Sequence, residues 1–226
     1  MKKNIFVMTF VIFCSLFCFS FNSYAELNNI SLNRSDDISI IFESENNIDK
    51  IISNIKSNKL INWSVNDLNQ LLDKVDKVDL SIMERATLKR EIIRESGFSN
   101  FDFKGTKADV LAFKDLKIEI KEIDKDLILY RRSKSGEPDS RYGLGYWWSD
   151  KKRNIEETRN ELAVLEAWGN PLSTEYIVEI PKGIRVLTGI TASQTQFQNG
   201  TDIVQEYREG GGVQYWINKV SVSWLK

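Results

Sequence analysis

The chain of 226 residues contains no histidine. This absence excludes Ser-His-Asp and Cys-His nucleophile systems, histidine general bases and histidine metal ligands. Only two cysteines are present, Cys14 and Cys18, and both lie close to the amino terminus. With 28% charged residues, 42% hydrophobic residues and a formal net charge of -1, the composition is that of a globular protein. It lacks the strong positive charge that nucleic-acid-binding proteins carry.

The first 25 residues are typical of a secretory signal peptide. Lys2 and Lys3 precede an apolar run over residues 5–21, and Ser23-Tyr24-Ala25 places small residues where a signal peptidase cuts, before Glu26. A retained membrane anchor is the alternative, although this run is at the short limit for a bilayer span. Cleavage would remove both cysteines and two lysines, which changes the formal charge from -1 to -3. We therefore expect a secreted or periplasmic protein that has no disulfide and no stable membrane span. We expect no metal, although a carboxylate or carbonyl site for a hard cation such as calcium is the alternative.

Glycine and proline divide the remaining chain into two parts. Neither residue occurs from Glu26 to Ser96, whereas all 12 glycines and all 3 prolines lie from Gly97 onward. We predict a helical amino-terminal region over residues 26–100 and a second domain over residues 101–226.

The first part has the apolar spacing of amphipathic helices. Isoleucines recur at helical intervals from Ile48 to Ile55, and two further periodic stretches follow Ser64 and Ser81. Ser64 and Ser81 are typical N-cap residues, and Gly97 is a typical helix stop. We expect three helices here.

The second part is mainly β in character. Apolar stretches predict strands over residues 126–131, 146–148, 176–180, 184–187, 213–217 and 220–225, with one helix over residues 154–168. The predicted fold class is α+β, with the helical region first.

Candidate binding residues are concentrated in this second part. Arg131, with Arg132 beside it, ends a strand and offers a planar set of donors for a phosphate or a carboxylate. A solvent-facing arginine is the alternative interpretation. Arg159 lies on the predicted helix, where pairing with a neighbouring glutamate is the alternative to a role in binding.

The segment over residues 141–149 combines an arginine, glycines, aromatic residues and a hydroxyl, namely Arg141, Gly143, Gly145, Tyr146, Trp147, Trp148 and Ser149. Aromatic faces beside an arginine suit a flat heterocycle attached to phosphates. A turn followed by a core strand is the alternative.

Three consecutive glycines, Gly210, Gly211 and Gly212, precede a short β stretch that contains Gln214 and Trp216. Glycines weaken a strand, so their presence indicates a bulge or a close approach by a ligand. Strand alternation places Gln214 and Trp216 on one face. A flexible hairpin is the alternative.

The order of these segments resembles that of NAD-consuming toxins of the ADP-ribosyltransferase superfamily, and most of all the tuberculosis-necrotizing-toxin type of NAD glycohydrolase. The similarity covers roughly residues 126–226. It lies in Arg141-Tyr142-Gly143 with Gly145-Tyr146, Arg159 before Leu162-Ala163, Glu175-Tyr176-Ile177-Val178, Gly189 with Thr191-Ala192, and Gly210-Gly211-Gly212-Val213-Gln214-Tyr215.

This resemblance implies a compact split-β-sheet domain that binds NAD in a cleft. Arg141 or Arg131 would hold the pyrophosphate, and Tyr146 and Trp147 would lie near the nicotinamide. Gln214 stands where transferases carry a glutamate, unless Glu206 or Glu209 takes that place. The other residues implied in NAD binding are Ser149, Arg159, Gly211 and Gly212.

Loss of nicotinamide from a ribose passes through an oxocarbenium-like state, and positioned polar groups can promote it without histidine, thiol or metal. We therefore expect an exported bacterial toxin or effector that cleaves NAD, as a glycohydrolase or as a mono-ADP-ribosyltransferase. Its expected partners are an immunity protein or a target-cell protein, and no nucleic acid. The alternatives are a non-enzymatic exported binding protein and a secreted nuclease toxin.

Overall fold

The computed structural model describes residues 34–44, 47–141 and 143–226. The predicted signal peptide and its cleavage site lie outside these residues. The chain divides into two units, Met1–Asp37 and Ile38–Lys226, and the second contains almost all of the described structure. Helix α2 (Ser35–Ile41) runs across the boundary between them. Within the described ranges, no helix combines the length and the apolar character needed to cross a membrane.

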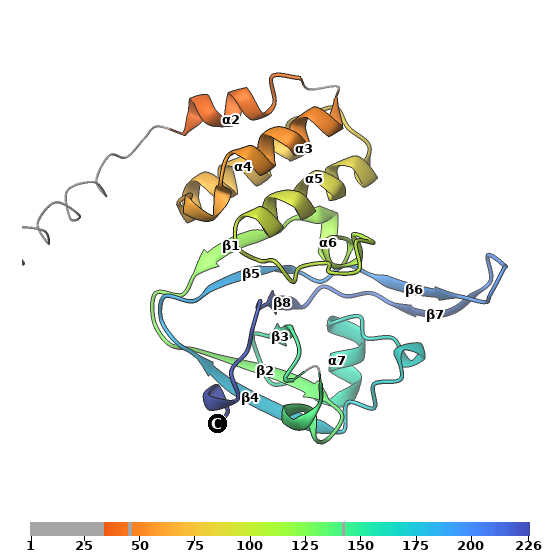
Figure 1. Cartoon of the computed structure of the whole chain (residues 1–226). Coiled ribbons are helices and arrows are strands. Elements are labelled where there is room, and N and C mark those ends of the chain that lie inside the picture. The colour runs from red at the N-terminus through yellow and green to blue at the C-terminus, as the bar shows by residue number, and fades with distance from the viewer. Residues whose placement is uncertain (1–33, 45–46, 142) are drawn as a thin grey trace, which may run out of the picture. The chain divides into compact units, whose positions relative to one another are not determined.

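Three helices form the first half of the second unit, as the sequence predicts (Figure 1). They are α3 (Ile48–Ser57), α4 (Val65–Lys77) and α5 (Ile82–Glu95). The Ser64 side chain accepts a hydrogen bond from the Asp67 backbone, and Ser81 with Glu84 forms a reciprocal capping box. These caps satisfy backbone groups that a helix start otherwise leaves unpaired. Gly97 follows α5 with a φ of 109°, a conformation that favours glycine.

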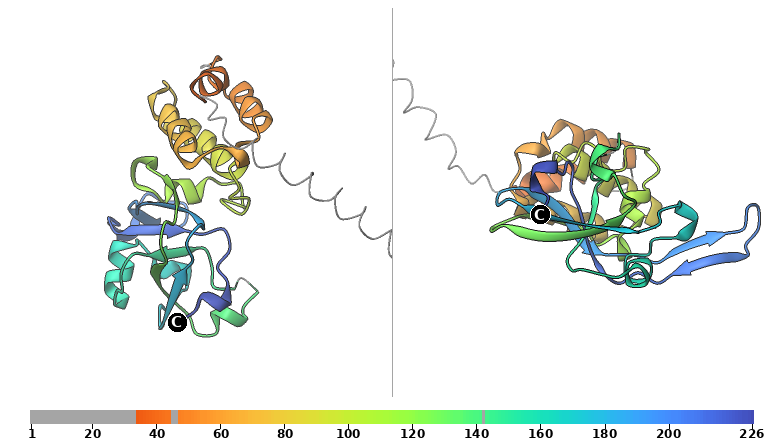
Figure 2. Two further views of the ribbon diagram at one scale, coloured as in Figure 1. Left: turned by 90° about the vertical axis from the view of Figure 1, so that its left-hand side faces the viewer. Right: turned by 90° about the horizontal axis from the view of Figure 1, so that it is seen from below.

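An antiparallel sheet of six strands forms the second half, in the order β1-β5-β8-β3-β2-β4. A separate hairpin of β6 and β7 extends away from it (Figures 1 and 2). The fold is therefore α+β, with the helices first. The strands are β1 (Glu119–Glu122), β2 (Leu127–Ser133), β3 (Trp147–Ser149), β4 (Thr174–Ile180), β5 (Arg185–Ile190), β6 (Gln194–Phe197), β7 (Val204–Arg208) and β8 (Val213–Trp216).

Short helical turns connect these elements. The α-helical ones are α6 (Ala108–Leu111) and α7 (Ile155–Glu161), and the 3-10 turns are η1 (Leu60–Asn62), η2 (Lys114–Leu116), η3 (Glu137–Asp139), η4 (Glu166–Trp168) and η5 (Val222–Trp224).

The helices and one face of the sheet share a single apolar core. Trp216 of β8 is fully buried, and the rings of Phe101 and Phe98 meet it edge-on at 5.3 and 6.0 Å. Tyr146 stacks on the same indole at 5.2 Å. The opposite face of the sheet packs into a second core around Leu129 and Trp148. Side chains of β8 alternate between the two faces of the sheet. Trp216 therefore packs in the first core, whereas Tyr215 packs against the second.

A buried ion cluster joins the helices to the chain that leads into the sheet. Lys89 of α5 is 1% exposed, and its Nζ lies 2.7 Å from Asp76 of α4. The same ammonium donates to the Leu116 carbonyl at 2.9 Å, and Lys117 approaches the other Asp76 oxygen at 2.5 Å. Although burial opposes it, these lysine contacts lower the pKa of Asp76. The cluster therefore fixes α4 and α5 against the segment before β1.

Two sequence predictions about the second half are wrong. The predicted helix over residues 154–168 is α7 followed by a turn, because Ala163 has a φ of 49° and the Val164 amide bonds back to the Arg159 carbonyl. The predicted strand over residues 220–225 is instead η5, with one isolated bridge between Leu225 and Val178.

Candidate functional site

A pocket of about 520 Å³ lies among α6, the sheet and the loop after α7. Its size is within the range usual for small-molecule sites. Its walls combine charged, aromatic and polar side chains from widely separated parts of the chain. The lining residues are Lys104, Ala108, Asp109, Ala112, Tyr130, Arg131, Arg132, Trp147, Trp148, Thr158, Leu162, Val164, Trp168, Asn170, Leu172, Thr191, Gln194 and Gln214.

Arg131 of β2 is a cation held rigidly in the wall of this pocket. One guanidinium nitrogen donates to the Trp147 carbonyl at 3.1 Å, and another lies 3.7 Å from a Glu137 oxygen. Its Nε is buried and has no hydrogen-bond partner among the described residues. Burial lowers the pKa of Arg131, and the charge of Glu137 opposes this shift. A β-carbon at Gly145 would lie 2.8 Å from the guanidinium, so this glycine allows the arginine its position.

The pocket wall carries an excess of positive charge. Arg132 lines it beside Arg131, and Lys104 lines it from the loop before α6. Arg132 also donates to the backbone carbonyls of Arg153 and Leu172, at 2.6 and 3.3 Å. Among the described lining residues, Asp109 is the single carboxylate, while outside the lining Glu137 lies 3.7 Å from Arg131 and Glu175 lies 3.6 Å from Arg132. An anionic ligand therefore suits this wall.

Gln214 projects from β8 beneath the same pocket. It is 6% exposed, and its Nε2 donates to the Ala112 carbonyl at 2.8 Å. Backbone pairing with Gly189 of β5 and Ser149 of β3 holds it in the middle of the sheet. A buried amide that is fixed on both sides has little freedom to move when a ligand enters.

Thr191 adds a second polar group to the pocket. It is 2% exposed, and its hydroxyl has no hydrogen-bond partner in the part of the chain that the structure describes. A buried unpaired hydroxyl is costly, so a site of this kind favours a ligand or a water that would satisfy it.

Asp109 of α6 is the acidic member of the lining. Its carboxylate accepts a hydrogen bond of 2.7 Å from the Asp102 amide. Burial raises the pKa of Asp109 to about 6; the Asp102 hydrogen bond lowers it, and the negative charge of Asp102 adds to the rise. A carboxyl group with this pKa exchanges a proton near neutral pH.

The pocket lining includes three tryptophans, Trp147, Trp148 and Trp168. Trp147 of β3 is half-buried, and its indole lies 5.5 Å from the ring of Phe113. Trp148 is buried, and its indole nitrogen donates to the Gly145 carbonyl at 3.3 Å. Trp168 of η4 is 56% exposed, although it also belongs to the lining. An exposed indole at such a position offers a flat surface to an incoming ring.

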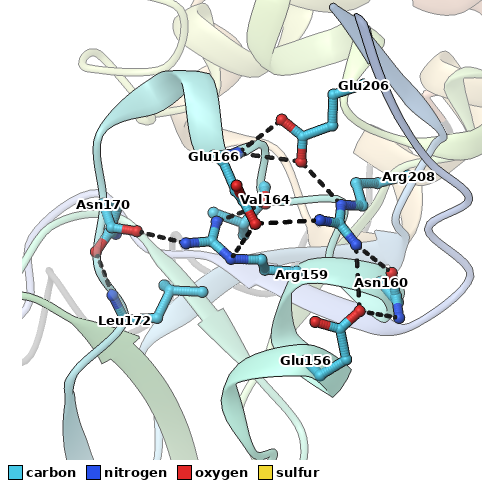
Figure 3. A network of polar contacts seen from close by, with 9 residues as sticks. All are labelled: Glu156, Arg159, Asn160, Val164, Glu166, Asn170, Leu172, Glu206 and Arg208. Carbon is cyan, nitrogen blue, oxygen red and sulfur yellow. Dashed lines mark hydrogen bonds and ion pairs between the residues drawn. The ribbon is translucent and has the colours of Figure 1, made fainter.

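A network of polar contacts holds the loop that carries Trp168 (Figure 3). Arg159 of α7 donates to the carbonyls of Val164 and Asn170, each at 3.2 Å. Both oxygens of Glu206 accept from the Glu166 amide, at 3.1 and 2.9 Å. Arg159 therefore positions one wall of the pocket from behind it.

The structure brings the candidate residues Arg131, Trp147 and Gln214 together in the pocket, and their sequence neighbours Arg132 and Trp148 also belong to its lining. The other candidates lie outside its lining. Arg141 is exposed in the chain before β3. Tyr146 stacks on Trp216, and the Ser149 hydroxyl lies 3.0 Å from the carbonyls of both Tyr130 and Lys151.

The three consecutive glycines, Gly210, Gly211 and Gly212, lie close to other segments of the protein. The amides of Gly210 and Gly212 donate to the last carbonyls of α7, and the Gly211 amide donates to the Thr191 carbonyl. A β-carbon at Gly212 would lie 2.8 Å from the Glu161 carbonyl, and one at Gly210 would lie 2.5 Å from that of Thr191. The run therefore fixes β8, and with it Gln214, against α7. Glu206 belongs to the network of Figure 3, and Glu209 is exposed outside the lining.

Sequence reasoning did not select Asp109, Trp168 or Thr191 as site residues. The sequence offered a signal for Thr191, because this residue belongs to one of the segments that carry the family resemblance. The sequence offered no signal for Asp109 or Trp168, because a lone aspartate and a tryptophan beside a turn are common in loops. Among the described residues, no group of three or more His, Cys, Asp or Glu side chains is placed to hold a metal ion.

No protein-family model matches the chain, and no curated protein matches it. A solved structure described as "Structure of Tne2 in complex with Tni2" is similar over 49% of this chain and 86% of that chain, with 14% sequence identity and a TM-score of 0.34. The functional argument therefore rests on the pocket itself.

Proposed function

We propose that this protein is an NAD-cleaving enzyme whose site is the pocket between α6 and the sheet. The observation that carries the proposal is the convergence of Arg131, Trp147 and Gln214 on one pocket of about 520 Å³. These residues come from three different strands, and each had been selected for a different part of NAD.

The charges of the wall match the charges of NAD. Arg131 and Arg132 are consecutive residues of β2 that both belong to the pocket lining. Because strand alternation directs their side chains to opposite faces, they would meet the two negative charges of a diphosphate from two sides. The flat face of Trp147 suits the nicotinamide ring, and the exposed Trp168 suits the second base at the entrance.

The reaction follows from these positions. The bond between the ribose C1′ and the nicotinamide nitrogen breaks, and its electron pair leaves with the nicotinamide, which becomes neutral. Positive charge develops on the ribose, where the fixed Gln214 amide oxygen stabilises it. Oxygen from water then bonds to C1′, the water loses one proton, and ADP-ribose forms. A protein side chain in place of water would give ADP-ribosyl transfer.

We further propose that the enzyme acts as an exported toxin or effector, and that an immunity protein protects the cell that makes it. The export part depends on the signal-like first 25 residues. Secreted or periplasmic material should begin at Glu26, and amino-terminal sequencing of that material checks the cleavage position. Retained Met1 in exported material would contradict it.

Product analysis tests the proposed activity. The purified protein is incubated with NAD, with and without a lysate of candidate acceptor proteins, and free nicotinamide, ADP-ribose and labelled protein are measured. Equal amounts of nicotinamide and ADP-ribose would show hydrolysis, and labelled protein would show transfer. If NAD stays intact in both samples, the proposal fails and the non-enzymatic binding interpretation takes its place.

A further inference from the structure

Cleavage of NAD by water requires a group that accepts a proton. Water that adds to the ribose C1′ must lose one proton, and a side chain placed in the pocket can take it during the reaction. The proposed function above assigns diphosphate, nicotinamide and ribose contacts, but it names no such group.

The pocket lining leaves one residue with the required chemistry. The chain contains no histidine. Arginine and lysine are protonated at neutral pH, and amides and hydroxyls are very weak bases. Among the described residues that line the pocket, Asp109 is the one carboxylate.

The position of Asp109 is fixed by the chain around it. Its carboxylate accepts the Asp102 amide at 2.7 Å, while Asp102 itself is 3% exposed and accepts the Thr106 amide at 3.2 Å. Asp109 lies one helical turn before Ala112, whose carbonyl binds the Gln214 amide. Asp109 and Gln214 therefore both belong to the pocket lining, and Ala112 connects the α6 segment to Gln214.

We propose that Asp109 is the general base of this site and receives the proton of the water that attacks the ribose. This inference rests on the proposed function. The bond from the water oxygen to C1′ forms as the nicotinamide leaves with the electron pair of the broken bond. The water proton moves to the Asp109 carboxylate and then to solvent, so no further reactant is needed.

The charged groups around Asp109 explain how it can serve as a base near neutral pH. Burial and the nearby Asp102 charge raise its pKa to about 6, and Lys104 opposes this rise. Arg131 and Arg132 face the same pocket from β2. A base is most effective when its pKa lies close to the working pH.

The first test compares Asp109→Asn with wild type across pH 4.5–8.5. Because asparagine keeps an oxygen for the Asp102 amide, this variant retains the hydrogen bond that positions α6. We expect wild-type kcat to fall below an apparent pKa of about 6, and Asp109→Asn to lose roughly 10²-fold in kcat together with this acid limb. The KM for NAD should change little. Since the chain has no histidine, an imidazole cannot produce such a limb.

Azide provides a second test that does not depend on the asparagine variant alone. Azide is already an anion and needs no base, so it should restore NAD consumption in Asp109→Ala and give ADP-ribosyl azide. Asp115→Asn is the matched control, because Asp115 is exposed, lies six residues further along the chain and is absent from the pocket lining. This control should behave as wild type.

Three results would overturn the assignment. Wild-type kcat and an unchanged acid limb in Asp109→Asn would exclude a base at this position. Loss of activity in both variants without any gain from azide would make Asp109 a positioning residue. Both results leave NAD cleavage by the wild type intact, so they differ from failure of the proposed function. If wild type itself leaves NAD intact, the proposed function and this inference fail together.

Discussion

Gln214 donates a hydrogen bond from a nearly buried position, so its replacement affects both the pocket and the fold. Gln214→Ala should lower the rate of nicotinamide release by roughly 10²–10³-fold, the usual cost of removing a preorganised group. The Ala112 carbonyl keeps a second donor, the Ala192 amide at 2.8 Å. Loss of stability should therefore be only about 1 kcal/mol in urea unfolding. Gln205→Ala, exposed on β7, is the control and should match wild type in both measurements. Full activity in Gln214→Ala would remove this residue from the site.

The raised pKa of Asp109 leads to a second prediction, which concerns how the stability of the folded protein depends on pH. Its pKa is raised from 3.8 to about 6 in the folded protein. The folded state therefore binds more protons than the unfolded state between these values, and stability falls as pH rises through this window. Asp109→Asn removes that dependence. At pH 7.5 its free energy of unfolding should be about 1–3 kcal/mol higher than that of wild type. At pH 4 this difference should be absent. An equal difference at both pH values would contradict the raised pKa.

Sequence reasoning selected Arg131, Trp147 and Gln214 as candidates because each belongs to a local pattern, a strand end or an alternating strand. It did not select Asp109, because the contact that joins the α6 segment to the sheet is not local. The hydrogen bond between Gln214 and Ala112 joins residues 102 positions apart. Arg141 was offered beside Arg131 for the same role, and only the paired sheet shows that Arg131 is the one in the pocket wall.

At the scale of elements, helices α3, α4 and α5 were predictable because their caps and apolar spacing are local signals. β1 was not, since its sequence is mostly charged and Ile120 is its single buried residue. β6 and β7 were missed because none of their residues is buried, so no alternation marks them. α7 was predicted too long because the turn at Ala163 depends on contacts of Arg159 with the loop beyond.

The buried ion cluster between α4 and α5 gives the clearest stability prediction for an element. Asp76→Ala would leave the Lys89 ammonium buried without its carboxylate, which typically costs about 3–5 kcal/mol. Thermal or urea unfolding measures this loss. Asp79→Ala, exposed just beyond α4, should cost far less. Equal free energies of unfolding for the two variants would show that Asp76 does not stabilise the packing of the helices against the sheet.

The loop that carries Trp168 should affect binding more than chemistry. Glu206→Gln removes the negative charge of the carboxylate that accepts the Glu166 amide. This change weakens that hydrogen bond and the ion pair between Glu206 and Arg208, which lie 2.9 Å apart. We expect the KM for NAD to rise roughly threefold to tenfold while kcat changes less, as for a residue that shapes the pocket without touching the reacting atoms. Glu209→Gln is the control, since Glu209 is exposed beyond β7. A fall in kcat with unchanged KM would contradict this role.

At the scale of the whole molecule, the boundary near residue 100 between a helical region and a separate second domain stays a prediction. Phe98 and Phe101 both lie against Trp216, so one core joins the helices to β8. We expect residues 38–226 to unfold in one cooperative transition, seen at the same denaturant concentration by tryptophan fluorescence and by circular dichroism. Two separate transitions, or a stable fragment after proteolysis near Gly97–Gly105, would show instead that the two parts fold independently.

The most direct test of the central claim, that this pocket binds NAD for cleavage, is a crystal structure with carbocyclic NAD. Its ribose ring oxygen is replaced by carbon, so the positive charge that cleavage requires is not stabilised and the molecule stays intact. We predict the diphosphate against Arg131 and Arg132, the nicotinamide against Trp147, and C1′ facing Gln214 and Asp109. The analogue bound at any other surface, or an empty pocket at saturating concentration, would contradict the account.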